Sequence, residues 1–345
     1  MAPSALREAL RRLMRGESLD SAETAEAFRE VMSGEGAPAL VAGLLVALRV
    51  KGETPGELAG AARALREAMT VLPVSDPSSL VDTCGTGGGV VPTFNISTAA
   101  ALVAAGAGLR VAKHGNRSFT TRSGSADVLE ALGVAIDIPA EAMGSVLDDA
   151  GIVFMFAPTM HPAMRHVGPV RRELGLETVM NMVGPLANPA LAGRQVIGVA
   201  DSSRAELMAG ALAELGTRHS LVVHGEPGMD EVSPLGPTTV IEVREGQVRR
   251  WTVDPGMLGV SGHVAGDLAG AGPEENARVV EAVLSGKASR AAESAVVLNA
   301  AAALLVGGRA STLGAGMDVA REAIASGAAR DALDRLRRAS RRARP

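Results

Sequence analysis

Aromatic residues are scarce in this chain of 345 residues: tyrosine is absent, tryptophan occurs once, and the aromatic share is only 2%. Since 47% of the residues are nevertheless hydrophobic, the core must consist mainly of Ala, Val, Leu, Ile and Met side chains. Ala and Leu favour helices, and the 41 glycines supply turns. The length suffices for one large domain or two linked domains with an ample core.

Cysteine and net charge are also low. The single cysteine, Cys84, excludes an intramolecular disulfide framework and is typical of a reducing compartment, so we expect a cytoplasmic protein. A formal net charge of −4 provides no global basic field, which argues against a nucleic-acid partner. We interpret the basic C-terminal segment RLRRASRRARP as a frayed, solvated helix end.

Long apolar runs are missing as well. The N-terminal segment MAPSALREALRRLMRGE is amphipathic and has no uninterrupted apolar stretch, unlike a secretory signal. The longest apolar runs, residues 98–109 and 295–306, are too short to span a bilayer. We therefore expect a soluble globular protein that has no membrane partner.

Helical periodicity characterises the first 70 residues, with apolar positions recurring in ALREALRRLM, TAEAFREVM and ALVAGLLVALRV. A fourth helix opens with Thr54-Pro55-Gly56-Glu57, a capping box with proline at the first helical position. Two prolines in LPVSDPSS, residues 72–79, then mark a boundary. The sequence predicts a helical domain over residues 1–72.

After residue 80, short β-rich runs alternate with helical ones, and the C-terminal part is helical again. We expect strands in LVDTC, LRVAKHG, GIVFMFA, RQVIGVA, SLVVHG, TVIEV and VRRWTV. Such alternation is typical of a mostly parallel sheet covered by helices. The predicted fold class is α/β, with a small all-helical N-terminal domain and a larger α/β domain.

A glycine-rich loop, VDTCGTGGGVVPTFNIST at residues 81–98, joins the first strand to a helix. It lacks the third glycine of a dinucleotide fingerprint, where Val90 stands, and the Gly-Lys-Ser/Thr of a P-loop. Free N–H groups and the dipole at a helix N-terminus still attract anions, and Ser97 and Thr98 add hydroxyl groups. The loop therefore predicts a phosphate site.

A second loop, residues 113–125, repeats this pattern one βα unit later. Lys113 ends a strand, Gly115 frees the backbone, and polar residues follow. Because the carboxyl ends of parallel strands meet at one sheet edge, we expect the two loops to bind one ligand with two separated phosphate groups. The polar residues of the second loop are Asn116, Arg117, Ser118, Thr120, Thr121, Arg122, Ser123 and Ser125.

Several motifs occur in the order found in one enzyme family: GTGG (85–88), NIST (95–98), KHGNRS (113–118), GSADVLEALG (124–133), HPAMRHVGPVRRELG (161–175), NMVGPLANP (181–189) and VVHGEPGMDEVS (222–233). Over most of its length the chain resembles the anthranilate phosphoribosyltransferases of tryptophan biosynthesis. The resemblance implies a pentosyltransferase with a nucleoside phosphorylase/phosphoribosyltransferase-like fold. It implies transfer of the phosphoribosyl group of 5-phosphoribosyl 1-diphosphate to the amine of anthranilate, the second step from chorismate.

The resemblance also implies the domain organisation. A helical segment around residues 165–190 joins the helical domain, and residues 73–164 and 191–345 form the α/β domain that binds 5-phosphoribosyl 1-diphosphate. The catalytic cleft lies between the two domains. We expect a homodimer through the apolar surface of the helical domain, including GELAGAARALREAM, residues 56–69.

Asp230 and Glu231 follow a predicted strand in a Gly/Pro loop, where adjacent carboxylates can converge on one hard cation. The resemblance implies two Mg²⁺ ions, held by Asp230, Glu231 and Ser97. An aromatic acid needs a planar cation for its carboxylate, and the residues alone do not separate Arg165 from Arg171. The resemblance selects Arg171 and implies an anthranilate site made of Gly85, Asn116, Arg171, His114, His161 and Pro185.

The amine of anthranilate is neutral at pH 7 and already nucleophilic, so we expect neither a nucleophilic residue nor a covalent intermediate. The resemblance implies that Arg171, Asn116 and Lys113 are the catalytic residues. It implies a site for 5-phosphoribosyl 1-diphosphate that contains Gly85, Gly88, Gly89, Thr93, Asn95, Ile96, Ser97, Thr98, Lys113, His114, Gly115, Asn116, Arg117, Ser118, Phe119, Thr120, Thr121 and Ser125.

Two positions depart from the family pattern. Gly89 stands where the glycine motif usually ends in Asp, and Glu177 reverses a charge that we expect on the acceptor side. Two alternatives stay open. One is a pyrimidine nucleoside phosphorylase, whose motif Lys-x-Ser-Thr-Gly-Gly differs from residues 84–88 here. The other is a non-enzymatic homologue that binds nucleic acid through the basic tail.

Overall fold

The computed structural model describes residues 4–118 and 122–344. Four helices open the chain: α1 (Ala5–Leu13), α2 (Ser21–Ser33), α3 (Pro38–Lys51) and α4 (Pro55–Glu67). At the start of α4, the Thr54 hydroxyl accepts from the Glu57 amide and the Glu57 carboxylate accepts from the Thr54 amide. The predicted capping box is therefore confirmed.

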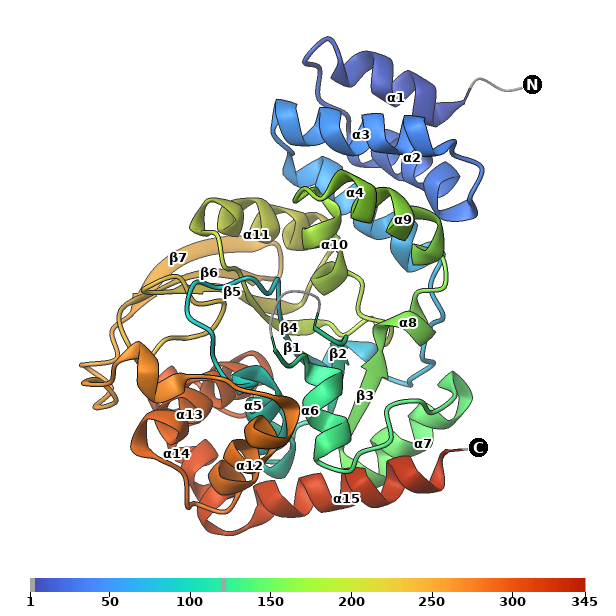
Figure 1. The fold of residues 1–345 in the computed structure, drawn as a ribbon. Helices are drawn as coiled ribbons and strands as arrows, with labels where there is room; N and C mark the ends of the chain where they lie inside the picture. Colours follow the sequence, from blue (N-terminus) through green and yellow to red (C-terminus); the bar gives the residue numbers. More distant parts are fainter. Residues whose placement is uncertain (1–3, 119–121, 345) are drawn as a thin grey trace.

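A seven-stranded sheet forms the centre of the second part of the molecule, in the order β3-β2-β1-β4-β5-β6-β7 (Figure 1). Its first five strands along the chain are parallel, and the last two are antiparallel, which confirms the predicted α/β class with a mostly parallel sheet. The strands are β1 (Val81–Gly85), β2 (Val111–Gly115), β3 (Ile152–Phe156), β4 (Arg194–Gly198), β5 (His219–Gly225), β6 (Thr238–Arg244) and β7 (Gln247–Val253).

The strand order reverses at β1, because the chain builds outward through β2 and β3 and then returns to place β4 on the other side of β1. Ligands of open α/β sheets bind where such a reversal leaves a crevice at the carboxyl ends of the strands. Gly85 and Gly198 are register partners, so β1 and β4 end side by side. The glycine-rich loop thus starts at the reversal point of this carboxyl edge.

Helices cover both faces of the sheet. Alternate residues of each strand point to opposite faces, and both sets include apolar side chains. Val196, Leu221 and Val240 pack in the same core as α5 and α13, whereas Ile197 and Val222 pack in the core that contains α11 and the N-terminal helices. These helices and their neighbours are α5 (Ile96–Gly106), α6 (Ser125–Ala131), α7 (Ala140–Ala150), α11 (Ala205–Glu214), α12 (Pro273–Leu284), α13 (Arg290–Val306), α14 (Leu313–Ala325) and α15 (Ala328–Arg342).

Helices from the middle of the chain lie against the N-terminal ones (Figure 1). After the short α8 (Ala157–Met160), helix α9 (Met164–Leu174) contacts α2 and α3, and α10 (Met180–Leu186) contacts α4. No helix within residues 4–118 and 122–344 combines the length and the apolar character that crossing a membrane requires.

Two expectations about surfaces are wrong. The apolar residues of α4 are buried against α2, α10 and α11, so residues 56–69 are not a free apolar surface for a second copy. The C-terminal helix is not frayed either, because α15 continues to Arg342 and buries Leu333, Leu336 and Ala339 against α5 and α7. Its arginines bond back to the fold, for example Arg342 to Asp149 at 2.8 Å.

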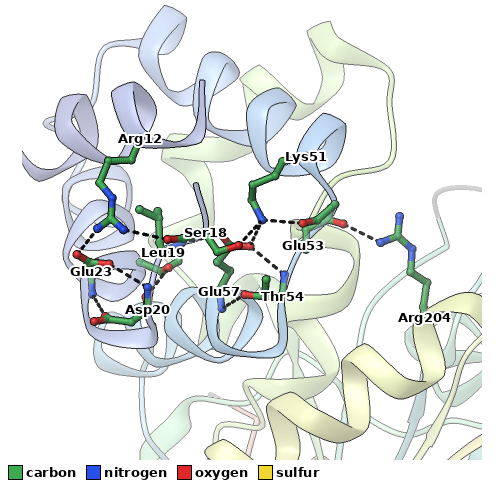
Figure 2. A network of polar contacts seen from close by, with 12 residues as sticks. Arg12, Ser18, Leu19, Asp20, Glu23, Lys51, Glu53, Thr54, Glu57 and Arg204 are labelled. Carbon is green, nitrogen blue, oxygen red and sulfur yellow. Dashed lines mark hydrogen bonds and ion pairs between the residues drawn. The ribbon is translucent and has the colours of Figure 1, made fainter. Parts of the chain in front are cut away.

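Ion pairs connect the turn between α3 and α4 to its surroundings, and we call Lys51, Glu53, Glu57 and Arg204 the α3–α4 network (Figure 2). Lys51 pairs with Glu57 at 2.9 Å, and the Glu57 side chain is completely buried. Arg204, in the short helix η2 (Ser202–Arg204) that follows β4, pairs with Glu53 at 2.7 Å. The network therefore links the N-terminal helices to the carboxyl edge of the sheet.

Candidate active site

The glycine-rich loop after β1 packs directly against Asp230, which lies in the loop after β5. The Gly87 amide donates to Oδ2 of Asp230 at 2.9 Å, and a Cβ on Gly85 would lie 2.5 Å from the same oxygen. A Cβ on Gly198 would lie 1.7 Å from the backbone oxygen of Asp230. The glycines therefore allow the loop that carries Asp230 to pack closely. The sequence alone predicts only that they make space for a ligand.

Glu231 follows Asp230 in the loop after β5, and its side chain reaches the start of α5. There its Oε1 accepts from the Ser97 amide at 3.1 Å. Loss of hydration raises the pKa of Glu231 to about 8, and the neighbouring Asp230 contributes to the rise. The pKa of Asp230 is raised by the same loss of hydration. With a pKa of about 8, Glu231 is largely protonated at pH 7 unless a cation stabilises its charged form. Neither carboxylate has a Lys or Arg ion-pair partner within the described residues, so the pair fits a site that a cation completes.

Within residues 4–118 and 122–344, no three His, Cys, Asp or Glu side chains converge as a complete metal site. The donors at the carboxyl edge are instead two carboxylates and the hydroxyl of Ser97. Mg²⁺ commonly takes one or two protein carboxylates and completes its shell with water and substrate phosphate. The donor set fits Mg²⁺ in this respect.

Lys113 lies on β2, and its ammonium group is next to Ser97. Among the described residues, no other lysine has an interaction with Ser97. The Nζ of Lys113 donates to the Thr83 carbonyl at 2.5 Å and lies 3.4 Å from Oγ of Ser97. Burial lowers the pKa of Lys113, and the charge of buried Asp82 counteracts this effect. Lys113 is thus a positive charge held rigidly behind the N-terminus of α5.

A pocket of about 550 Å³ lies between the sheet and helices α4, α8, α9 and α10, and we call it the acceptor pocket. Most of its wall is apolar and includes Leu65 from α4 and Pro185 from α10. All six residues expected at the anthranilate site line it: Gly85, His114, Asn116, His161, Arg171 and Pro185.

Arg171 differs from the two other arginines of the acceptor pocket in its exposure. Arg171 is half-buried on α9, whereas Arg165 and Arg172 are exposed. Burial lowers the pKa of Arg171, and its guanidinium donates to the neutral Oδ1 of Asn181 at 3.5 Å. Among the described residues no carboxylate pairs with Arg171, so its guanidinium is available to an anionic ligand. Exposure distinguishes the arginines that sequence alone did not separate.

His114 and His161 form a buried pair on the wall of the same pocket. Their Nε2 atoms lie 3.1 Å apart, with the rings edge to face at 62°. Burial lowers the pKa of His114 to about 3 and that of His161 to about 4. Both rings are therefore neutral at pH 7, one donating a hydrogen bond to the other, and they add no charge to the pocket.

The second loop is tied to the first through Asn95. Its side-chain amide donates to the Ser123 carbonyl at 3.1 Å, and Asn276 of α12 donates to its Oδ1 at 3.0 Å. Gly115 ends β2 where a Cβ would lie 2.1 Å from Oγ of Ser125, so the loop closes tightly there. These contacts hold the two predicted phosphate loops side by side.

Four of the binding residues expected at these loops are paired, buried or bridged within the protein, and their role as ligands stays a prediction. Arg117 is paired with Asp127 at 2.9 Å and with Glu130, so its charge is used on the protein. The Thr98 hydroxyl is buried and directed away from solvent, and the Ile96 side chain belongs to the core. Thr93 is half-buried and bridges to Ala269. The expected ligands Phe119, Thr120 and Thr121 lie outside the described residues.

Glu177 also lies elsewhere than expected. It lines a smaller pocket of about 160 Å³ beside the glycine-rich loop, together with Thr86, Asp201 and Arg204, and it does not line the acceptor pocket. Gly89 lies beside the acidic loop, where its Cβ would be 3.3 Å from Oδ1 of Asp230. Both departures from the family pattern are therefore on the phosphate side of the site.

Sequence reasoning missed two polar residues that support the site. Asp82 is completely buried, and its carboxylate accepts from the His114 amide at 3.2 Å and from the Asn188 side chain at 2.8 Å. A carboxylate in the middle of the apolar run LVDTC was a usable signal, because charged residues are rarely buried without partners. The indication for Asn188 in the sequence was weaker, because it is only one of two asparagines in the motif NMVGPLANP.

Comparisons with known proteins agree on one family. Residues 77–330 match the model of the glycosyl transferase family, a/b domain, and residues 7–69 match that family's helical bundle domain. The anthranilate phosphoribosyltransferase of Roseiflexus castenholzii is 50% identical over 96% of this chain and 97% of the relative. That of Symbiobacterium thermophilum is 48% identical, over 97% and 98% of the two chains.

Solved structures give the same result. The crystal structure of anthranilate phosphoribosyltransferase from Thermus thermophilus has a TM-score of 0.91 at 44% identity, covering 98% of this chain and 100% of that one. The Saccharomyces cerevisiae enzyme, solved in complex with PRPP and Mg, has a TM-score of 0.89 at 29% identity, with 99% of each chain covered. The chain therefore belongs to the anthranilate phosphoribosyltransferase family.

Proposed function

We propose that the protein transfers the phosphoribosyl group of 5-phosphoribosyl 1-diphosphate to the amine of anthranilate, forming N-(5-phosphoribosyl)anthranilate and diphosphate. The enzyme is a pentosyltransferase of tryptophan biosynthesis. One observation carries the proposal: two adjacent carboxylates beside the two phosphate loops adjoin an apolar pocket with one half-buried arginine, and none of the three has an ion-pair partner among the described residues. Relatives of this identity favour neither a nucleoside phosphorylase nor a nucleic-acid-binding protein.

On the donor side, Asp230, Glu231 and Ser97 would hold magnesium, and we propose two ions because the two carboxylates turn toward different elements. When bound, the metal neutralises the negative charge that develops on the departing diphosphate. The chain's own contribution is the set of N–H groups in the glycine-rich loop and at the start of α5, together with the Lys113 ammonium. These preorganised dipoles and charges stabilise the same leaving group.

On the acceptor side, Arg171 would bind the anthranilate carboxylate through two parallel hydrogen bonds. Asn116 and the backbone at Gly85 would orient the amine toward the ribose, while Pro185 and the neutral histidine pair would line its path. Holding amine and ribose together in this way lowers the barrier through proximity. The arrangement needs no general base, since the amine attacks in its neutral form.

Cys84 is the strongest potential nucleophile in the acceptor pocket. Burial and the nearby Asp82 raise the pKa of its thiol well above the usual value, so it stays protonated at pH 7. Because the thiolate is the reactive form, Cys84 is a poor nucleophile here. This supports direct attack by the amine without a covalent enzyme intermediate.

The test of this function is a continuous assay of anthranilate fluorescence with 5-phosphoribosyl 1-diphosphate and Mg²⁺. The variant Arg171→Ala is expected to raise the KM for anthranilate by at least about tenfold with a smaller effect on kcat, because a charged hydrogen-bond pair is lost. Arg278→Ala, an exposed arginine of α12 that does not line the acceptor pocket, is the matched control. Absence of turnover in the wild-type protein, or equal KM values in the two variants, would contradict the proposal.

We also propose a cytoplasmic homodimer that contacts through α3 rather than through α4. Helix α3 is apolar on most sides yet leaves Val50 82% exposed and Leu40, Val46 and Ala47 half-buried. An apolar helix face of this kind is typical of a protein contact. Sedimentation equilibrium tests the state, and a monomer at all concentrations would exclude it.

A further inference from the structure

Four arginines gather at the amino ends of the parallel strands, the edge of the sheet opposite the active site. Arg194 begins β4, Arg218 immediately precedes β5, Arg244 ends the antiparallel β6, and Arg309 follows α13. Arg194 is the register partner of His219, and His219 is the register partner of Arg244. Because registered residues of adjacent strands point to the same face, Arg194, His219 and Arg244 stand in one row, and Arg218 and Arg309 lie beside it on the wall of the same cavity.

The row borders a cavity of about 440 Å³, which we call the amino-edge pocket. Its other wall comes from the end of α13, including Leu305 and Gly308. The length of β4 separates Arg194 from Gly198 at the carboxyl edge, a span of roughly 13 Å along the strand. The pocket is therefore distinct from the active site, and its volume is in the range of small-molecule sites.

The guanidinium groups of this pocket are held by neutral partners. Arg194 donates to the carbonyls of Ser78 and Val306, Arg218 donates to the Ser78 hydroxyl at 3.1 Å, and Arg309 donates to the Gly108 carbonyl at 2.8 Å. None of the four arginines takes part in an ion pair within residues 4–118 and 122–344. These contacts hold Arg194, Arg218 and Arg309 in place without pairing their guanidinium groups with a carboxylate.

The surrounding carboxylates, including Asp76 near Arg194, offset only part of the positive charge of the arginines. Glu245 lines the pocket without an ion-pair partner in the described structure, while the carboxylate of Asp76 accepts from the amide and hydroxyl of Ser78. Glu242 is engaged by His219 at 2.7 Å and by Trp251 at 3.2 Å. Burial, together with nearby Arg218 and Arg244, lowers the pKa of Arg194, as expected of like charges held close together.

We propose that the amino-edge pocket is a second ligand site, which binds a small anion bearing phosphate groups. Planar guanidinium groups match phosphate oxygens in pairs, and several converging ones suit a ligand with more than one anionic group. A single concave site favours a small molecule over a nucleic-acid strand, because strand binding uses exposed aromatic rings along a groove. The one tryptophan nearby, Trp251, is half-buried and bonded to Glu242.

The experiment measures binding of inorganic diphosphate by calorimetry in EDTA, at an ionic strength kept constant with chloride. The pocket variant is Arg218→Gln with Arg244→Gln, both exposed residues whose replacement leaves the core intact. The control is Arg330→Gln with Arg338→Gln, exposed residues of α15 with the same change in charge. We expect the wild-type protein and the control to bind one more diphosphate per chain than the pocket variant, or to bind it at least about tenfold more tightly.

A local readout accompanies the calorimetry. Trp251 is the only tryptophan of the chain, and it connects to the pocket through Glu242 and His219. Its fluorescence should change with diphosphate in the wild-type protein and the control at the calorimetric midpoint. Identical isotherms for wild type and pocket variant, or equal losses in both variants, would overturn the proposal. Preferential binding of a single-stranded oligonucleotide that depends on Arg218 and Arg244 would overturn it in favour of nucleic acid.

Discussion

The α3–α4 network and the carboxylates at the carboxyl edge are two clusters of charged residues that differ in their partners. In the network, the completely buried Glu57 is paired with Lys51, and Glu53 is paired with Arg204 (Figure 2). At the edge, Asp230 and Glu231 are half-buried and receive only backbone N–H groups. The first set is complete within the chain and holds two parts of the fold together. The second set has no ion-pair partner among the described residues, and we propose that a cation from outside completes it.

The largest expected effect removes the unpaired set. In Asp230→Asn with Glu231→Gln, kcat/KM should fall by at least about a thousandfold, because the cation and the leaving group lose their charged partners. Folding stability should stay the same or rise, since uncompensated carboxylates are no longer dehydrated. Turnover by anthranilate fluorescence and chemical denaturation measure the two quantities. Glu226→Gln, an exposed acid of the same loop, is the control, and near wild-type turnover of the double variant would refute the assignment.

The paired set should show the reverse pattern. In Lys51→Ala, the free energy of unfolding should fall by about 3 kcal/mol, because Glu57 is left as a buried charge without its partner. The kcat of the folded fraction should stay near that of the wild type, since Lys51 does not line the acceptor pocket. Urea denaturation measures the loss. Arg11→Ala, which breaks the exposed pair with Glu8, should leave stability unchanged within error, and an equal loss there would contradict the comparison.

The buried pair His114 and His161 differs from both clusters, because burial keeps these side chains neutral and they need no charged partner. The pKa values of about 3 for His114 and about 4 for His161 lie below the ordinary 6.5 that each ring regains on unfolding. The unfolded chain therefore binds more protons below about pH 6.5, and stability is lost as the pH falls from there toward 4. At pH 5 each histidine should cost about 2 kcal/mol relative to pH 8.

Denaturation at pH 8, 6 and 5 tests this histidine prediction. The variant His161→Gln should lose less stability over this range than the wild-type protein. Identical pH dependences of wild type and His161→Gln would rule out a titrating pair.

The smallest expected effect adds charge to the unpaired set. Gly89→Asp places a carboxylate beside Asp230, since a Cβ there lies 3.3 Å from Oδ1 of Asp230. The Mg²⁺ concentration for half-maximal rate should fall by a few-fold, because a further carboxylate strengthens cation binding. Gly89→Ala separates this effect from crowding against the Gly228 carbonyl, which lies 3.1 Å from the same Cβ. A change of the same size in both variants would exclude the electrostatic explanation.

Local patterns were enough to predict the regular elements. The capping box at Thr54 and Glu57, the seven strand segments and the βα alternation each depend on residues close together in the chain, and the structure confirms them. The adjacency of Asp230 and Glu231 after a strand also indicated an acidic loop at the carboxyl edge. Such features follow from backbone geometry and periodicity, which short segments carry by themselves.

Ion pairs, hydrogen bonds and packing contacts between residues distant in the sequence could not be predicted in the same way. Arg117 is neutralised by Asp127 and Glu130, the apolar face of α4 is covered by α2, α10 and α11, and Asp82 lies behind Lys113 and His114. Each of these outcomes depends on which surfaces meet after folding. The same holds for Glu177, which lies beside the glycine-rich loop and not in the acceptor pocket.

By itself, the amino-acid sequence determined the order of helices and strands, the two glycine and polar loops, and the residues that carry a family resemblance. Only the tertiary structure decided which charges are compensated: Glu57 by Lys51, Arg117 by two acids, Arg171 and the Asp230–Glu231 pair by no charged side chain in the described residues. The physical reason is that helix and strand formation depends on near neighbours. Burial and charge pairing depend on segments that approach one another only in the folded chain.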